Sequence, residues 1–239
     1  MYAVRTVGSG LGVTVVDNNG AVLNEYSAAS YVRGNDTYGA IALADDGRFY
    51  VASQDSLIAF TPGVKEGEAI YTSNQVHDVK VLPNGNLLVL SAYDLVEITP
   101  GGALVRNVST PWLVDARGLE YDAVSNDIYV SMLGYSDNFF QLMRVDGSSG
   151  ALEKSTSFWY GSDLLLTTDR RLLAGSWTLA PKFFNTELRA GPNLGNQQQL
   201  FVSQYAQDVQ AAIPEPGSLI LLTAGVVALT QVRRRQRRA

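Results

Sequence analysis

The chain repeats one pattern of short apolar segments and tight turns, and this repeat is the feature that most constrains its fold. Four units begin at Tyr38, Val76, Arg117 and Gly161, so the successive steps are 38, 41 and 44 residues. Each unit contains an apolar strand, a polar turn, a second strand rich in Val, Leu or Tyr, and two further strands around another turn. Four short strands in a period of about 40 residues are typical of a β-propeller blade, so the sequence predicts an all-β propeller.

The first turn of each unit supports the assignment of hairpins. Asp46-Gly47 and Asn84-Gly85 are dipeptides that favour the positive φ angles of type I′ turns, and Asn126-Asp127 and Asp169-Arg170 stand at the corresponding places. A β-sandwich built from the same hairpins is the alternative fold.

The first 30 residues add three strands, "YAVRTVGS", "LGVTVVDNNG" and "AVLNEYSA", without an innermost strand. We therefore expect about five blades. A propeller closes its ring so that no strand edge is left unpaired. Either a strand near Gln199–Tyr205 completes the first blade, or residues are missing upstream. The start of the chain also shows no basic segment followed by an apolar one, as a signal peptide would, and this favours an N-terminal truncation.

Charge and composition exclude several classes of function. The net charge is −5, but five arginines lie within the last seven residues, so the rest of the chain carries −10. An acidic body does not attract phosphate backbones, and we expect no nucleic-acid partner. The chain has no cysteine, which excludes disulfides and thiolate chemistry.

The C-terminal end has the properties of a membrane-spanning segment. From Ile213 to Val232 there is no Lys or Arg, and Glu215 is the one charged residue. About 20 helical residues cross a hydrocarbon layer of roughly 30 Å. The arginines that follow match the positive-inside rule, so the sequence predicts a single helix over 217–232, a cytoplasmic tail over 233–239 and a body outside the cytoplasm.

This end of the chain resembles the PEP-CTERM sorting signal of bacterial exported proteins. The signal residues are Pro214, Glu215, Pro216, Arg233, Arg234, Arg235, Arg237 and Arg238. The resemblance implies an exosortase-type sorting enzyme as partner, transient membrane anchoring through the helix, and delivery to the cell surface or extracellular matrix. It divides the chain into a propeller body over 1–206, a linker with the Pro-Glu-Pro motif over 207–216, the helix and the tail.

The repeat units are similar to those of NHL-like and gluconolactonase-like propellers. Lactonase-like propellers hold a divalent cation in the central channel with acidic and amide ligands. When the first turns are superposed, Asp78 and Asp163 fall at equivalent positions on the innermost strands, where Ala40 and Leu119 stand in the other units. The channel candidates are therefore His77, Asp78, Arg117 and Asp163. We expect His77, which adjoins Asp78 in a strand, to be exposed or bonded to a loop rather than part of a dyad.

Two functions follow from these observations. The first is a binding module for polysaccharide or envelope proteins, with Trp112, Trp159, Trp177 and Tyr135 in or near loops where sugars could stack. The second is a metal-dependent, lactonase-like hydrolase. No nucleophile elbow or other catalytic cluster stands out, so the sequence favours a protein that is not an enzyme, with no cofactor beyond the cation that the second function requires.

Overall fold

A computed structural model of the protein describes residues 2–7, 10–17, 20–28, 40–108, 113–133, 139–159, 164–174 and 182–193. All regular structure within these ranges is β-strand, arranged as one three-stranded and four four-stranded antiparallel sheets. The three-stranded sheet contains β1 (Tyr2–Val7), β2 (Gly10–Val16) and β3 (Val22–Ala28). These are the three strands that the sequence predicts before the first full unit.

Each of the four units forms one sheet whose strands are ordered as in the sequence. The second sheet contains β4 (Ile41–Leu43), β5 (Phe49–Ser53), β6 (Ser56–Phe60) and β7 (Glu68–Thr72). The third contains β8 (Val76–Val81), β9 (Leu87–Ser91), β10 (Leu95–Ile98) and β11 (Leu104–Asn107). The fourth contains β12 (Ala116–Asp122), β13 (Asp127–Leu133), β14 (Phe139–Asp146) and β15 (Leu152–Trp159). The fifth contains β16 (Leu164–Leu166), β17 (Arg171–Ala174), β18 (Lys182–Asn185) and β19 (Ala190–Asn193).

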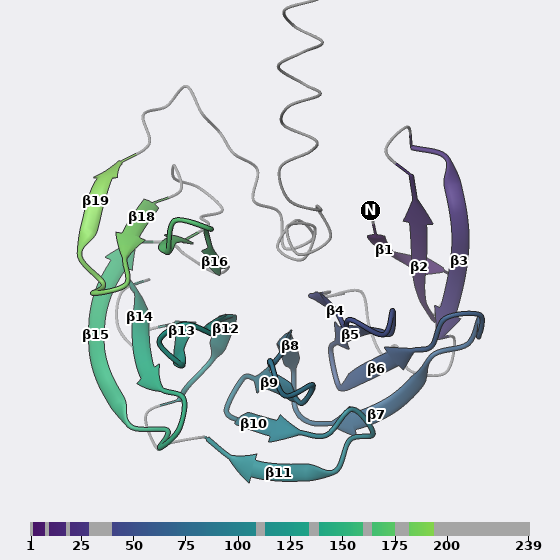
Figure 1. Cartoon of the computed structure of the whole chain (residues 1–239), viewed down its shortest axis with the longest axis horizontal. Helices are drawn as coiled ribbons and strands as arrows, with labels where there is room; N and C mark the ends of the chain where they lie inside the picture. Colours follow the sequence, from purple (N-terminus) through teal and green to yellow (C-terminus); the bar gives the residue numbers. More distant parts are fainter. Residues whose placement is uncertain are drawn as a thin grey trace, which may run out of the picture.

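The sheets follow one another around a common centre (Figure 1). The first strand of each four-stranded sheet, β4, β8, β12 or β16, lies on the inner side, and the last, β7, β11, β15 or β19, lies on the outer side. This radial arrangement confirms the propeller prediction with four complete blades, and it differs from the two facing layers of a β-sandwich.

The hydrophobic core lies between successive sheets. Alternate side chains of a middle strand pack against the preceding sheet and against the following sheet. On β9, Leu87 and Val89 pack toward the preceding sheet, whereas Leu88 and Leu90 pack toward the following one. Successive side chains of a strand point to opposite faces, so a strand covered on both faces is apolar throughout. The same alternation places Phe49 and Tyr50 of β5 in two different clusters.

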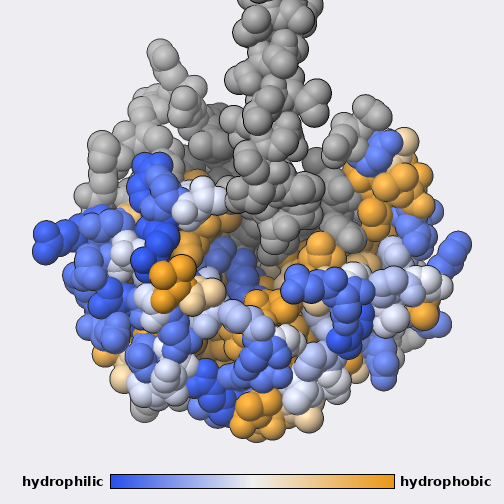
Figure 2. Space-filling model, in the orientation of Figure 1, coloured by the Kyte–Doolittle hydropathy of each residue, from blue (hydrophilic) through white to orange (hydrophobic). Residues whose placement is uncertain are grey.

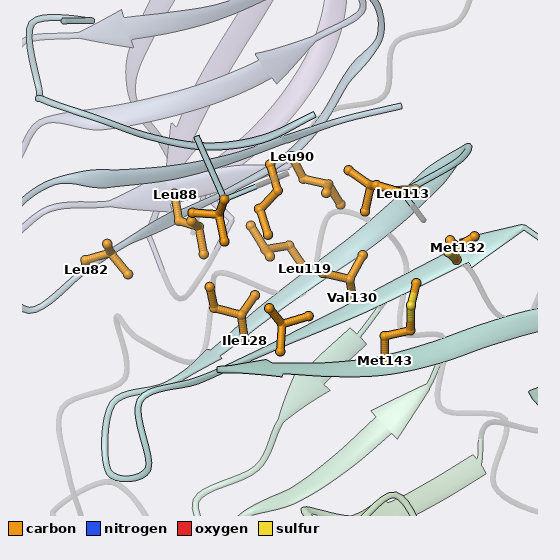
Figure 3. Packing of buried hydrophobic residues seen from close by; sticks show 13 residues of the cluster. Leu82, Leu88, Leu90, Leu113, Leu119, Ile128, Val130, Met132 and Met143 are labelled. Carbon is orange, nitrogen blue, oxygen red and sulfur yellow. The ribbon is translucent and has the colours of Figure 1, made fainter. Parts of the chain in front are cut away.

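The largest of these clusters joins the β8–β11 and β12–β15 sheets (Figure 3). Leu88 and Leu90 come from one sheet, and Leu119, Ile128 and Val130 come from the other. Burying one such side chain stabilises the fold by about 1.5–3 kcal/mol. Contacts between neighbouring blades are thus a main source of stability.

Each turn at which the sequence predicts a hairpin contains one residue of positive φ. Gly47, Gly85, Asn126 and Arg170 have φ angles of 83°, 81°, 62° and 58°. Their partners Asp46, Asn84, Asp127 and Asp169 do not have positive φ, so these hairpins do not have the type I′ conformation, which needs two such residues. One hairpin differs in length: five residues separate the paired Val81 and Leu87, whereas six separate Tyr121 from Ile128. This extra residue shifts the equivalence between blades by one position.

Turns between the third and fourth strands lie against the preceding sheet. The backbone N–H of Ser27 in β3 donates to Lys65 O at 2.9 Å, and a Cβ on Gly102 would stand 1.9 Å from Ile70 O in β7. Arg106 and Arg144 likewise donate to carbonyl groups in such turns of the following sheets. The blades are therefore joined by hydrogen bonds as well as by apolar packing.

In the part of the chain described by the structure, no helix has both the length and the apolar character needed to cross a membrane. The helix expected over 217–232 and the closing strand expected near Gln199–Tyr205 lie outside the described residues.

Candidate functional site at the inner edge of the propeller

The inner strands β8 and β12 carry three of the channel candidates, His77, Asp78 and Arg117, in a register that differs from the one predicted from the sequence. A bulge interrupts β8 at His77, four positions before the paired Val81, and β12 at Arg117, four positions before the paired Tyr121. His77 and Arg117 are therefore equivalent residues of adjacent blades, and Gly118, rather than Leu119, is the counterpart of Asp78. The extra residue in the β12–β13 turn caused the error.

His77 is buried, with 4% of its surface exposed, which contradicts the exposed side chain that was one of the two alternatives predicted from the sequence. Burial lowers the pKa of His77 to about 4, and the positive charge of Arg117 acts in the same direction. The imidazole is thus neutral at neutral pH. Arg117 forms an ion pair with Asp115 at 2.7 Å, so the guanidinium is held at this end of the inner strands.

Asp78 joins the inner strands of two blades. Its Oδ1 accepts the N–H of Val79 at 2.7 Å, and its Oδ2 accepts the N–H of Leu119 in β12 at 2.8 Å. The side chain is buried, and this burial raises the pKa of Asp78 to about 6 despite the two hydrogen bonds and the nearby Lys80 ammonium. The carboxylate satisfies amides of inner strands, each of which pairs with a neighbouring strand on only one side.

Glu120 stands on the inner strand of the next blade, β12. Its carboxylate accepts the Nζ of Lys80 at 3.0 Å, and both side chains are about nine-tenths buried. Burial raises the pKa of Glu120, while Lys80 and the backbone N–H groups of Tyr121 and, in β16, of Leu166 oppose that shift. Asp78, Lys80 and Glu120 therefore form a buried charged cluster that links the β8–β11 and β12–β15 blades.

This cluster holds adjacent blades together through a hydrogen bond and an ion pair, and we call it the clasp. Both oxygens of Asp78 accept amide N–H groups, and an ammonium stands beside the two carboxylates, which opposes the binding of a cation at the same place. Within the described residues, no group of three His, Cys, Asp or Glu side chains could hold a metal ion. Asp163 lies outside the described residues, as do the side chains of Trp112, Tyr135, Trp159 and Trp177.

Sequence analysis identified Asp78 and missed Lys80 and Glu120. The signal was available: in the register of the structure, these two opposite charges occupy equivalent positions in the inner strands of adjacent blades. Detecting it required the correct length of the β12–β13 turn.

Solved structures support the fold. A chain of hydrazine synthase from Kuenenia stuttgartiensis is similar, with a TM-score of 0.58 and 18% identity over 77% of this chain and 61% of that one. The present chain thus spans less than two thirds of that structure. A protein of unknown function from Bacteroides caccae has a TM-score of 0.59 and 13% identity, covering 80% of this chain and 71% of that one.

A chain in the nidogen/laminin complex has a TM-score of 0.57 and 11% identity, over 77% of this chain and 72% of that one. At these identities the similarity concerns the propeller fold alone. No curated protein sequence matches the chain.

Residues 212–238 match the PEP-CTERM protein-sorting motif. This match confirms the resemblance of the C-terminal end and includes the Pro-Glu-Pro triplet and the arginines. The motif implies an exported protein that is anchored in a membrane and then processed by an exosortase. Together, the fold and the motif define an exported β-propeller protein with a C-terminal sorting signal.

Proposed function

We propose that this chain is a cell-surface or extracellular-matrix protein whose propeller is a non-catalytic binding module for polysaccharide. The observation that carries the proposal is the combination of the sorting motif at 212–238 with a propeller whose buried inner charges bind one another and the backbone. Hydrophilic side chains cover much of the outer rim in Figure 2, as suits contact with a hydrated polymer. Envelope proteins are the alternative partners.

The proposed route to the surface assigns a role to each part of the tail. A helix over 217–232 holds the chain in the bilayer, and the linker over 207–216 presents Pro214, Glu215 and Pro216 to the sorting enzyme. The arginines keep the C-terminus in the cytoplasm. Each arginine near an anionic leaflet contributes about 1 kcal/mol, so the cluster retains the tail without making the anchor permanent.

The sorting step is tested by replacing Pro214, Glu215 and Pro216 with Ala in the native host. The apolar segment is unchanged, so we expect normal insertion but no maturation. Intact-mass measurement should then find Arg233–Ala239 on the variant and not on the mature wild-type protein. A control variant with Ala at Gln207 and Gln210 keeps the triplet and should mature normally. A wild-type surface protein that retains the arginines, or a triplet variant that matures normally, would contradict the proposal.

Binding is tested with the mature protein and the extracellular polysaccharide of the same host, by native electrophoresis in gels that contain the polymer. We expect retardation that increases with polymer concentration. Equal mobility at all concentrations would exclude the polysaccharide and direct attention to envelope proteins.

The hydrolytic alternative rests on one observation, the presence of a buried carboxylate with a raised pKa at the inner edge of the propeller. It requires Asp78 and Asp163 to share a divalent cation. Elemental analysis of the purified protein decides between the two functions. One bound Ca²⁺ or Zn²⁺ per chain, lost in Asp78→Asn, would support the hydrolase, whereas equal metal content in both proteins would count against it.

A further inference from the structure

We propose that a cleft between the β8–β11 and β12–β15 sheets binds one neutral sugar unit of the polysaccharide. This inference rests on the proposed function and assigns a site to it. The cleft has a volume of about 180 Å³. It lies at the end of the blades where the β8–β9 and β12–β13 turns stand, and His77 and Arg117 lie at the other end of the same strands.

Both sheets contribute polar groups to the cleft. Asn84, Glu97 and Arg106 come from the β8–β11 sheet, and Tyr121 and Asn126 come from the β12–β15 sheet. Pro83 and three members of the core cluster between these sheets, Leu82, Leu88 and Ile128, complete its lining. Several polar groups beside a small apolar surface are typical of sites that bind small molecules.

The polar side chains are held in place before any ligand binds. Glu97 Oε1 accepts Asn86 Nδ2 at 2.7 Å and Asn84 Nδ2 at 3.2 Å, while Oε2 accepts Arg106 Nε at 2.6 Å. In the opposite wall, the Tyr121 hydroxyl donates to Asn126 Oδ1 at 2.8 Å. Groups fixed in this way lose little conformational entropy on binding.

These side chains retain hydrogen-bonding capacity. Arg106 uses Nε, one Nη1 proton and one Nη2 proton, for Glu97, Ser148 O and Gly147 O, so two of its five N–H groups remain. Asn84 Nδ2 has a second proton, and the Tyr121 oxygen can still accept. The cleft thus presents donors and an acceptor at several points, a pattern that the hydroxyl groups of a sugar can satisfy.

Charge and size narrow the class of ligand. Burial works to raise the pKa of Glu97, but hydrogen bonds from Asn86, Arg106 and Asn84 outweigh it, so the carboxylate is ionised and balances Arg106. A charge-balanced cleft favours a neutral ligand over an anion or a cation. Its volume of about 180 Å³ is below the roughly 300–1,000 Å³ of pockets for drug-sized molecules, which suits a single sugar ring.

Two substitutions test the site in the full-length chain, purified in mild detergent, with the host polysaccharide as the probe in affinity gels. Asn84→Asp keeps the side-chain oxygen that caps the turn through Asn86 N, but it removes the amide protons and places a second carboxylate beside Glu97. Tyr121→Phe keeps the ring and removes the hydroxyl. Each variant should bind about fivefold to tenfold more weakly, as expected for the loss of one or two hydrogen bonds.

The matched control is Asp46→Asn in the corresponding turn of the preceding blade, where Asp46 is exposed, caps Arg48 N and pairs with the half-buried Arg48 side chain. It should bind like the wild type. Thermal unfolding establishes that each variant is folded. If Asn84→Asp does not fold, the affinity of Tyr121→Phe alone tests the site. Wild-type affinity in a folded Tyr121→Phe would overturn the site and leave the proposed function standing. A wild-type protein that does not bind the polymer would overturn both.

Discussion

Replacing Asp78 with Asn tests the electrostatic character of the inner edge. The substitution preserves the size of the side chain and removes its charge. The amide oxygen can still accept one of the two N–H groups, from Val79 or Leu119, that the carboxylate binds at 2.7 and 2.8 Å. One amide then loses its acceptor, at a cost of about 1–3 kcal/mol that does not depend on pH.

The substitution also has a pH-dependent effect on the free energy of unfolding, and this effect favours the variant as the pH rises. Burial raises the pKa of Asp78 from 3.8 to about 6, so the folded protein holds this proton more tightly than the unfolded chain. The stability that results is present below the unfolded pKa and is lost as the pH rises through about 6. At 1.36 kcal/mol per pH unit, the wild type loses about 3 kcal/mol between pH 3.5 and 7.5 that the variant does not lose. Glu120 titrates in both proteins, so its contribution largely cancels in the difference.

Urea unfolding of both proteins across this pH range measures the effect. The free energy of unfolding of Asp78→Asn, relative to the wild type, should rise by about 3 kcal/mol from pH 3.5 to 7.5. Asp169→Asn is the control: Asp169 is exposed, and hydrogen bonds from Thr167 and Arg171 lower its pKa, so any change should be small and of opposite sign. A flat difference for Asp78→Asn, or one that falls with pH, would refute the argument that burial dominates this carboxylate.

Two further predictions concern packing between blades, and both are measured by chemical denaturation at pH 7. Gly102→Ala should destabilise the fold by at least about 2 kcal/mol, because Gly102 has a φ of 87° and its new Cβ would stand 1.9 Å from Ile70 O. Gly63→Ala, with a φ of 82° and open space around it, should cost only the backbone strain, so equal losses would argue against the contact. Leu90→Ala should cost about 2–5 kcal/mol, because Leu90 is fully buried in the cluster of Figure 3. Leu104→Ala, at a side chain that is 64% exposed, should cost less than about 0.5 kcal/mol, and a comparable loss at both sites would contradict this assignment of the core.

The architecture could be predicted from the sequence because its determinants are local. Asp46-Gly47 and Asn84-Gly85 specify turns through backbone conformation, and the structure has positive φ at Gly47 and Gly85. The apolar run Leu87–Leu90 has no alternation, which fits a strand covered on both faces. Both signals lie within one blade, so they can be recognised without knowing which blade packs beside it.

The inner cluster depends on that knowledge. The hydrogen bond from Leu119 N–H to Asp78 joins residues 41 positions apart, and the ion pair between Lys80 and Glu120 joins residues 40 positions apart. Both contacts can be predicted only when the sequences of adjacent blades are aligned without an error of even one residue. A single extra residue in the β12–β13 turn moved Leu119 into the place of Gly118 and separated Lys80 from Glu120 in the alignment. The presence of a turn at Asn126 was evident from the sequence, but its length was not.

The inner edge and the cleft differ in what their carboxylates bind, and this difference explains why only the cleft is suited to a ligand. Asp78 accepts amides of two blades, and Glu120 accepts the Lys80 ammonium of the neighbouring blade, so a ligand there would have to displace contacts that hold the blades together. At the cleft, Glu97 instead orients Asn84 and Arg106, which line it and keep further N–H groups for a ligand. A sugar can therefore bind in the cleft without breaking a contact between blades. Substitutions in the turn residues can also change the specificity of the cleft, while the contacts between blades at the inner edge are preserved.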